Sequence, residues 1–167
     1  GFNTGSAGVA VLGNLDTKLL TEEARAALVG LLAWRLDVGH VDASSLVGYP
    51  SGGRSLTLRA VSGHRDVNST ACPGANLYPE LDGIAAEAAL LGLPKLYEPV
   101  VEASPKGGVR FRARLSEPLP WSVTVTGTAG EVARRAGSGS AIDWAWRAES
   151  VAPGTYGYAI ASTDDVL

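Results

Sequence analysis

The segment most informative about the fold is residues 63–74, which read GHRDVNSTACPG. It holds His64, one of two histidines in the chain, and Cys72, the only cysteine. Imidazole and thiolate are ligands that zinc favours in proteins. The residues between them favour turns, and Pro73-Gly74 forces a change of direction before the segment that follows. The stretch therefore predicts a loop between a strand and a helix that carries two candidate metal ligands.

The spacing of His64 and Cys72 does not by itself establish a metal site, because such a pair is more often two unrelated core or surface residues. A zinc hydrolase needs three protein ligands and an open position for water. The other histidine, His40, has no partner at metal-binding spacing, and we expect it to be a packing or surface residue. Asp66 offers carboxylate oxygens, but it could equally pair with Arg65 or cap the following turn.

Two other chemistries stay open but are less favoured. A thiol hydrolase could pair Cys72 with His64, although the neighbouring sequence shows no evident partner to orient the histidine. A Ser/His/Asp triad is also conceivable, although the chain has no Gly-x-Ser-x-Gly motif.

Ahead of the stretch, residues 6–13 form a small apolar run without alternation, typical of a strand buried on both faces. Thr21 then offers an N-cap, and helical spacing continues to a predicted end near Asp37–Gly39. A loop rich in Gly, Ser and Pro is predicted at about 42–55, and alternation at 56–60 predicts a strand.

Behind the stretch, residues 75–91 predict an amphipathic helix. Its predicted buried face consists of Leu77, Leu81, Ile84, Ala85 and Ala88. The first half thus alternates strand and helix, which is an α/β pattern.

The second half has a different pattern of apolar and polar residues from the first half. Residues 94–108, rich in Pro and Gly, predict a linker. Beyond it, apolar and polar residues alternate in short runs separated by turns, which predicts a small β-sandwich. The predicted strands are 109–115, 121–126, 142–146 and 156–160, with turns at 127–130, 137–139 and 153–154. We expect the tryptophans and tyrosines of these runs to pack in the core and against the faces of the strands rather than to form a carbohydrate-stacking platform.

Composition bounds the function. The chain has 167 residues, 46% hydrophobic and 19% charged, as in a soluble globular protein of one or two small domains. A net charge of −3 provides no basic field for nucleic acid. No apolar run is long enough to span a bilayer, and no signal peptide is present. The chain begins with Gly1 and lacks methionine, so we expect it to be a piece of a longer reading frame, which leaves its compartment open.

Two segments carry a resemblance to a known family. Residues 1–14 (GFNTGSAGVAVLGN), together with GHRDV at 63–67, TACPG at 70–74 and Leu77-Tyr78, resemble the peptidoglycan recognition protein family, which is also the type-2 N-acetylmuramoyl-L-alanine amidase family. The resemblance covers roughly residues 1–93. It implies a central mixed sheet flanked by helices and a zinc enzyme that cleaves the amide between N-acetylmuramic acid and L-alanine in bacterial peptidoglycan.

Residue roles follow from the resemblance by position. His64 and Cys72 would be two of the three zinc ligands, and Thr70 would stand where family members carry a catalytic Thr or Lys. Asn3 and Thr4 would lie near the substrate groove. Recognition proteins of the family that bind peptidoglycan without cutting it typically lack the cysteine, so Cys72 favours a catalytic parent.

The chain also departs from the family pattern. The family's first zinc ligand is a histidine on an early strand, followed by a catalytic tyrosine, and both belong to an N-terminal portion without a counterpart here. We therefore expect the third zinc ligand outside this chain, and an amidase-type domain that lacks its N-terminal part. The predicted strand at 6–13 would then lack neighbours.

The last part, about 100–167, resembles the Ig-like module of flagellar hook-capping proteins and of bacterial surface and wall-active proteins. AIDWAW at 141–146 and PGTYGYAI at 153–160 carry this resemblance.

The predicted organisation is thus a partial amidase domain at 1–93, a linker at 94–108 and an Ig-like sandwich at 109–167. The predicted function is that of a secreted or cell-wall-associated zinc amidase. This chain would be one part of that enzyme and would be inactive by itself. A noncatalytic peptidoglycan-binding module and a structural or adhesive module are the alternatives.

Overall fold

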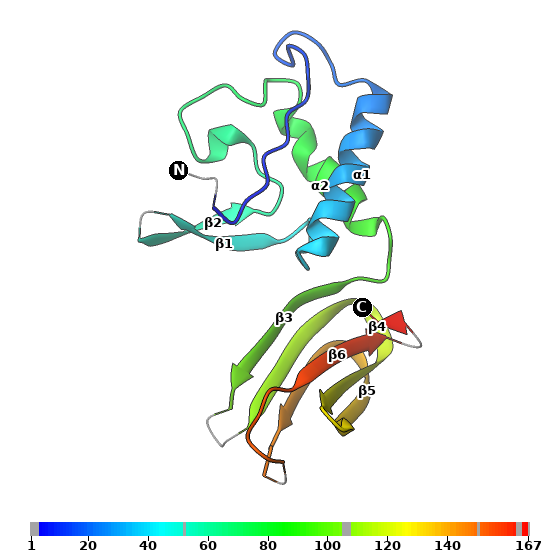
Figure 1. Cartoon of the computed structure of the whole chain (residues 1–167). Helices are drawn as coiled ribbons and strands as arrows, with labels where there is room; N and C mark the ends of the chain where they lie inside the picture. Colours follow the sequence, from blue (N-terminus) through cyan, green and yellow to red (C-terminus); the bar gives the residue numbers. More distant parts are fainter. Residues whose placement is uncertain (1–3, 52, 105–107, 150, 163–164, 167) are drawn as a thin grey trace. The chain divides into compact units, whose positions relative to one another are not determined.

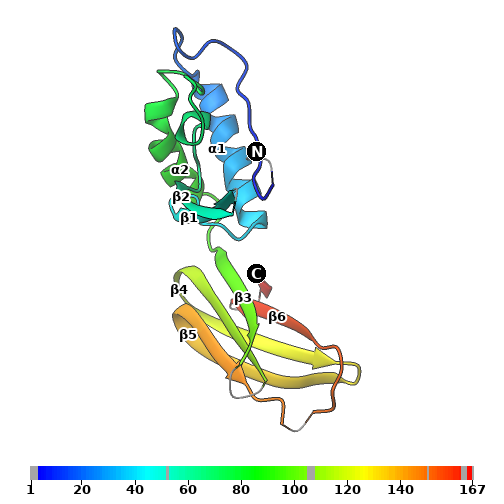
Figure 2. The same cartoon turned by 90° about the vertical axis from the view of Figure 1, so that its left-hand side faces the viewer.

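The computed structural model describes residues 4–51, 53–104, 108–149, 151–162 and 165–166. The chain divides into two compact units, 1–92 and 93–167, and each is described by itself (Figures 1 and 2). The fold is mixed α/β, with two sheets, few helices and mostly strands. Among the described residues, no helix is long and apolar enough to cross a lipid bilayer.

Helix α1 (Glu22–Val38) begins and ends as its sequence predicts. The Thr21 side chain accepts a hydrogen bond from the Ala24 amide at 3.2 Å, which caps the N-terminus. At the other end, the Gly39 amide donates to the carbonyls of Leu36 and Asp37. The left-handed residue after the helix is His40, with φ 52°, and not the glycine.

Helix α2 (Leu81–Leu90) begins six residues later than predicted, after the 3₁₀ helix η2 (Tyr78–Glu80). Pro79 explains the delay, because a proline cannot donate a backbone hydrogen bond to the turn before it. The predicted buried face is confirmed in full: Leu77, Leu81, Ile84, Ala85 and Ala88 are all buried. They form the core of the first unit with Leu15, Leu28, Val29, Ala33, Ala43 and Val61.

The sheet of the first unit is an antiparallel hairpin of β1 (Leu46–Ser51) and β2 (Arg54–Arg59). The prediction of a loop over 42–55 was therefore wrong at its second half. Tyr49 pairs with Leu56 across the hairpin and is itself buried, which stabilises a strand despite the neighbouring Gly, Ser and Pro. Within the described residues, this hairpin stands in place of the predicted central mixed sheet.

The predicted strand at 6–13 was wrong: these residues form no regular element. Val9 is exposed, and Leu12 is 97% exposed. A strand buried on both faces needs neighbours for its backbone groups and its side chains. No described strand pairs with 6–13, and of this run the half-buried Val11 packs against the core of the first unit without forming part of a sheet.

The second unit is an antiparallel sheet of β3 (Leu96–Ala103), β4 (Val109–Gly127), β5 (Gly130–Trp146), β6 (Gly157–Ser162) and β7 (Asp165–Val166). Strand β5 pairs with β4 on both sides of an interruption between Arg114 and Leu119, while β3 and β6 share the other edge of β4 at opposite ends. Strand β3 lies within 94–108, which was predicted to be a linker. Leu96 and Tyr97 are buried where they pair with β4, and this burial outweighs the flanking prolines.

The predicted strands 109–115 and 121–126 are joined in the single strand β4. Its register against β5 shifts between Arg114 and Leu119, which bends the strand without ending it. The predicted turn at 137–139 lies inside β5, where a Cβ on Gly137 would come within 2.4 Å of the Trp121 ring. The alternating residues of β4 and its partners form one core: Leu96, Phe111, Leu115, Trp121, Val123, Val125, Ile142 and Ile160.

Candidate functional site

The loop at 63–74 closes on itself. Its first residues form the 3₁₀ helix η1 (His64–Asp66). The loop is closed by a hydrogen bond from the Arg65 amide to the Cys72 carbonyl at 3.0 Å. This bond joins the backbone next to one predicted zinc ligand to the backbone of the other. His64 and Cys72 are both exposed. Both side chains thus come from the same closed loop on the surface of the first unit.

His64 has a partner within the loop. Its Nε2 atom lies 2.7 Å from the Asn68 side-chain nitrogen. An amide nitrogen can only donate, so Nε2 accepts in this arrangement and the neutral ring carries its proton on Nδ1. A metal ion at Nε2 would have to replace the amide of Asn68.

Thr70 lies beside Cys72, as its position in the sequence predicts. Its Oγ1 accepts a hydrogen bond from the Cys72 amide at 3.3 Å, and the side chain is exposed. This short contact is an ST-turn, which fixes the backbone ahead of the thiol. The Thr70 oxygen is the acceptor in this bond, so the bond does not use the hydroxyl proton.

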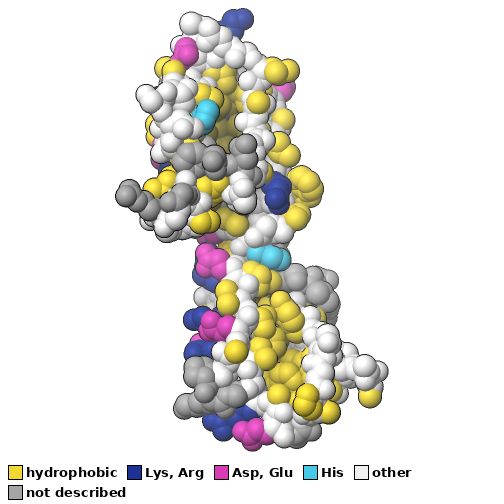
Figure 3. All heavy atoms as spheres, turned by 60° about the vertical axis from the view of Figure 1, so that its left-hand side comes forward, with side chains coloured by type: hydrophobic (Ala, Val, Ile, Leu, Met, Phe, Trp, Pro, Cys, Tyr) yellow, Lys and Arg dark blue, Asp and Glu magenta, His cyan; other side chains and the backbone are white. Residues whose placement is uncertain are grey.

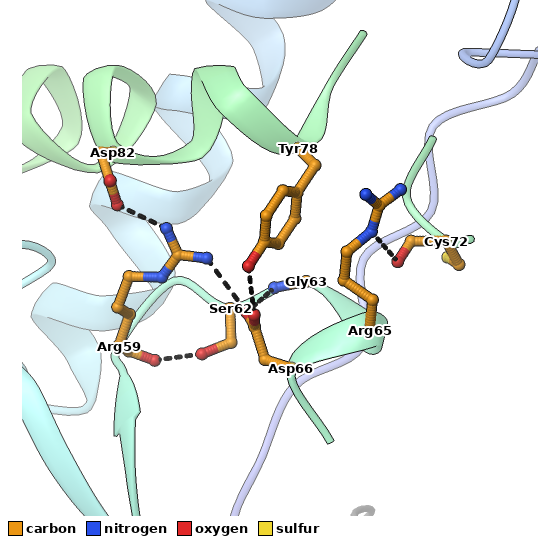
Figure 4. A network of polar contacts seen from close by, with 8 residues as sticks. All are labelled: Arg59, Ser62, Gly63, Arg65, Asp66, Cys72, Tyr78 and Asp82. Carbon is orange, nitrogen blue, oxygen red and sulfur yellow. Dashed lines mark hydrogen bonds and ion pairs between the residues drawn. The ribbon is translucent and has the colours of Figure 1, made fainter. Parts of the chain in front are cut away.

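Asp66 is the centre of the polar contacts that anchor the loop (Figure 4). One carboxylate oxygen accepts from the Gly63 amide at 2.8 Å and from Arg59 at 3.1 Å, and the other accepts from the Tyr78 hydroxyl at 2.5 Å. Arg59 also donates to Asp82 at 2.7 Å. Asp66 therefore joins the loop to strand β2, through Arg59, and to the segment that precedes α2.

The contacts of Asp66 also set its charge. Burial by itself would raise the pKa of this carboxyl, but the hydrogen bonds from Tyr78 and Gly63 and the Arg59 guanidinium together lower it below its ordinary value. The same hydrogen bond, supported by burial, raises the pKa of Tyr78. Asp66 is thus a carboxylate that accepts, and Tyr78 a phenol that donates.

Two guanidinium groups lie over the ring of Tyr78. Arg65 lies 4.5 Å from the ring centroid and Arg59 lies 5.2 Å from it. Sequence reasoning considered an ion pair of Asp66 with Arg65, but the structure pairs Asp66 with Arg59. The roles of Tyr78 and Arg59 were missed, because Asp66 and Tyr78 lie 12 positions apart and form no recognisable sequence motif.

The end of the loop is fastened to the segment before α1. Gly74 has φ +110°, and a Cβ there would lie 2.7 Å from the Leu15 carbonyl carbon. Just beyond it, the Ala75 amide donates to the Asp16 side chain at 2.8 Å, and the Asn76 amide donates to the Leu15 carbonyl at 2.9 Å. A glycine is thus needed where the two segments meet.

Of the two predicted substrate-contacting residues, Thr4 is the one that lies within the described part of the chain. Asn3 lies outside the described residues. Thr4 is exposed, and its carbonyl accepts a hydrogen bond from the Tyr49 hydroxyl at 2.7 Å, which ties it to the β1–β2 hairpin.

The loop carries two side chains of the types that bind metal ions, His64 and Cys72. Among the described residues, no group of three or more His, Cys, Asp and Glu side chains could hold a metal ion. His64 and Cys72 offer one nitrogen and one sulfur, which suits zinc, but a closed or catalytic zinc site needs at least one more protein ligand.

The second unit has an apolar hollow of its own. Figure 3 shows hydrophobic side chains gathered on one face of this unit. A pocket of about 200 Å³ is lined by aromatic and aliphatic side chains from several strands, among them Val101, Phe111, Trp146, Tyr156 and Tyr158. These aromatic rings pack against one another, with Tyr158 5.4 Å from Phe111 and Tyr156 5.7 Å from Trp146 between ring centroids, while Tyr158 is 50% exposed.

Comparison with known proteins adds no relative. No family model matches the chain, and neither a curated protein nor a solved structure matches it with significance.

Proposed function

We propose that this chain belongs to a zinc-dependent N-acetylmuramoyl-L-alanine amidase of bacterial peptidoglycan, secreted or associated with the cell wall. The observation that carries the proposal is the bond from the Arg65 amide to the Cys72 carbonyl at 3.0 Å. It closes the loop so that the exposed His64 and Cys72 both come from one short surface segment. The sequence resemblance of residues 1–14 and 63–78 supplies the reaction and the substrate.

In this proposal, His64 and Cys72 hold the zinc ion with a third ligand from outside the described residues. When bound, zinc supplies an activated water and polarises the scissile carbonyl. Asn68 would have to release Nε2 of His64, because in the present arrangement the other ring nitrogen, Nδ1, carries the proton. The Thr70 hydroxyl, held by the Cys72 amide, is free to donate to the oxyanion that forms on the amide carbonyl. Asn3 and Thr4 are proposed to contact the substrate.

The finer fold assignments are part of the same proposal. Helices α1 and α2 with the β1–β2 hairpin would be the part of an amidase-type domain that this chain contains. The second unit would be an Ig-like sandwich, supported by residues from both ends of the bent strand β4, such as Phe111 and Val125, in one core.

The test is hydrolysis of purified peptidoglycan by the protein expressed from its complete coding sequence. We expect the release of free L-alanine amino groups, abolished by Cys72→Ser and by His64→Gln. His40→Asn is the matched control, because asparagine tolerates the left-handed backbone of His40. Hydrolysis that survives Cys72→Ser would contradict the proposal. We expect the 167-residue chain alone to release none.

A noncatalytic peptidoglycan-binding module is the second candidate, favoured by the aromatic pocket of the second unit. Exposed aromatic rings such as Tyr158 can stack on sugars. Binding of the chain to insoluble peptidoglycan in the presence of a chelator would support this candidate if Tyr158→Ala weakens it and Val132→Ala does not. Binding that disappears with the chelator would favour the metal-dependent function.

A further inference from the structure

The Arg65 side chain contacts the Cys72 end of the loop and the ring of Tyr78. We propose that it is a positioning residue, which holds the Cys72 backbone at a fixed place relative to His64. The inference rests on the proposed function for the ligand roles of His64 and Cys72. The position of Cys72 relative to His64, which Arg65 is proposed to fix, can be measured without a metal ion.

Arg65 contacts the Cys72 end of the loop three times. Its backbone amide donates to the Cys72 carbonyl at 3.0 Å, and its Nε lies 3.5 Å from the same oxygen. Its Nη2 donates to the carbonyl of Ala71. Arg65 therefore holds both carbonyls that flank the Cys72 amide, while its own backbone continues directly from His64.

The guanidinium of Arg65 is itself held in place. It lies over the Tyr78 ring at 4.5 Å, between that ring and the Cys72 carbonyl (Figure 4). The Tyr78 hydroxyl is bound by Asp66, which also accepts from the Gly63 amide at the start of η1. The contacts thus form a continuous series from Gly63 through Asp66, Tyr78 and Arg65 to Cys72.

This arrangement needs the shape of arginine and not only its charge. A guanidinium is planar, so it can stack on an aromatic ring and donate along its edge to two carbonyls at once. A lysine ammonium is a point charge without a plane and cannot do both. Zinc–ligand bonds vary little in length, about 2.0–2.1 Å to nitrogen and 2.3 Å to sulfur. A loop that lets Cys72 drift from His64 would therefore hold the ion poorly.

The test measures the effective concentration of two thiols placed at the ligand positions. In the 167-residue chain, His64→Cys adds a second thiol to that of Cys72, and a glutathione redox buffer reports how readily the two form a disulfide. Arg65→Gln and Arg65→Lys are then added separately. Arg35→Gln is the matched control, since Arg35 is exposed in the last turn of α1. Thermal unfolding of each reduced variant separates loss of position from loss of fold.

We expect Arg65→Gln to lower the effective concentration about tenfold, the loss that follows from removing charge-assisted hydrogen bonds. Arg65→Lys should lower it less and Arg35→Gln not at all. The proposal is overturned if Arg65→Gln leaves the value unchanged, if the control lowers it equally, or if the reference pair forms no disulfide. Should Arg65→Gln unfold the chain, Arg65→Lys decides, and an unchanged value overturns the proposal.

A second measurement separates this inference from the proposed function. Zinc binding by the otherwise unchanged chain is measured with and without Cys72→Ser. A chain that shows the expected disulfide series but no Cys72-dependent zinc binding would retain Arg65 as a positioning residue and would overturn the proposed zinc site.

Discussion

The two units of this chain are stabilised in different ways. The second unit is an antiparallel sheet whose core comes from alternating apolar residues of strands that pair with one another. The first unit has an apolar core between two helices, but its loop at 63–74 is held by polar contacts centred on Asp66. Core residues are replaceable only at a cost to the whole unit, whereas the polar contacts affect chiefly the loop and the ligands on it.

The largest expected effect breaks either core. Ile84 in α2 and Ile142 in β5 are both buried, and either Ile→Ala substitution should destabilise its own unit by about 2–5 kcal/mol. Amide hydrogen exchange, followed unit by unit, measures the effect. If Ile142→Ala increased exchange in the α1 and α2 amides as strongly as in β4, the two units would not be independent.

The next effect concerns the close approach at the end of the loop. Gly74→Ala should cost about 1–3 kcal/mol of backbone strain, because its φ is +110° and the new Cβ would meet the Leu15 backbone. Denaturant unfolding measures the loss. Gly8→Ala is the control, since nothing lies within 4 Å of a Cβ there. Equal stability of the two variants would show that the loop does not depend on this junction.

An effect of similar size is expected at Asp66. Asp66→Asn should cost about 1–3 kcal/mol, because the amide cannot accept as many of the hydrogen bonds from Arg59, Gly63 and Tyr78. Thermal unfolding at neutral pH measures it. Asp82→Asn, at an exposed partner of Arg59, serves as control and should cost less.

The pH dependence has a definite sign. Because the folded pKa of Asp66 is lowered, its contribution is complete above the unfolded value of about 3.9 and is lost as pH falls toward the folded pKa. The first unit should therefore lose stability below about pH 4, and Asp66→Asn should remove that part of the loss. An unchanged acid slope in the variant would contradict the assignment.

The smallest effect is expected at the second unit's own ion pair. Arg110 and Asp143 pair at 2.5 Å across β4 and β5, and the contact lowers the pKa of Asp143. Both side chains are exposed, so solvent and salt screen the pair. Asp143→Asn should leave unfolding of this unit nearly unchanged at physiological salt. A loss as large as that of Asp66→Asn would erase the contrast between the units.

Sequence reasoning succeeded where the needed partner lies nearby in the chain. The Thr21 cap and the buried face from Leu77 to Ala88 follow from spacing within one helix. It failed for 6–13, because an apolar run becomes a strand only when another strand pairs with it. It also missed β1, whose Tyr49 is buried through pairing with β2.

The candidate site divides in the same way. The closed loop with His64, Thr70 and Cys72 could be predicted, because its turn residues and its ends lie within one short segment. The support of that loop by Tyr78 and Arg59 could not, since a ring–guanidinium contact between residues 19 positions apart depends on the fold that brings them together.

The most direct test of the central claim is Co²⁺ binding by the 167-residue chain, followed by the absorption that a thiolate gives when it binds this ion. The account predicts such an absorption with weak affinity, abolished by Cys72→Ser, weakened by His64→Gln and retained in His40→Asn. An absorption that is absent from the unchanged chain, or that His64→Gln leaves intact, would contradict the claim that the loop at 63–74 presents both residues to one ion.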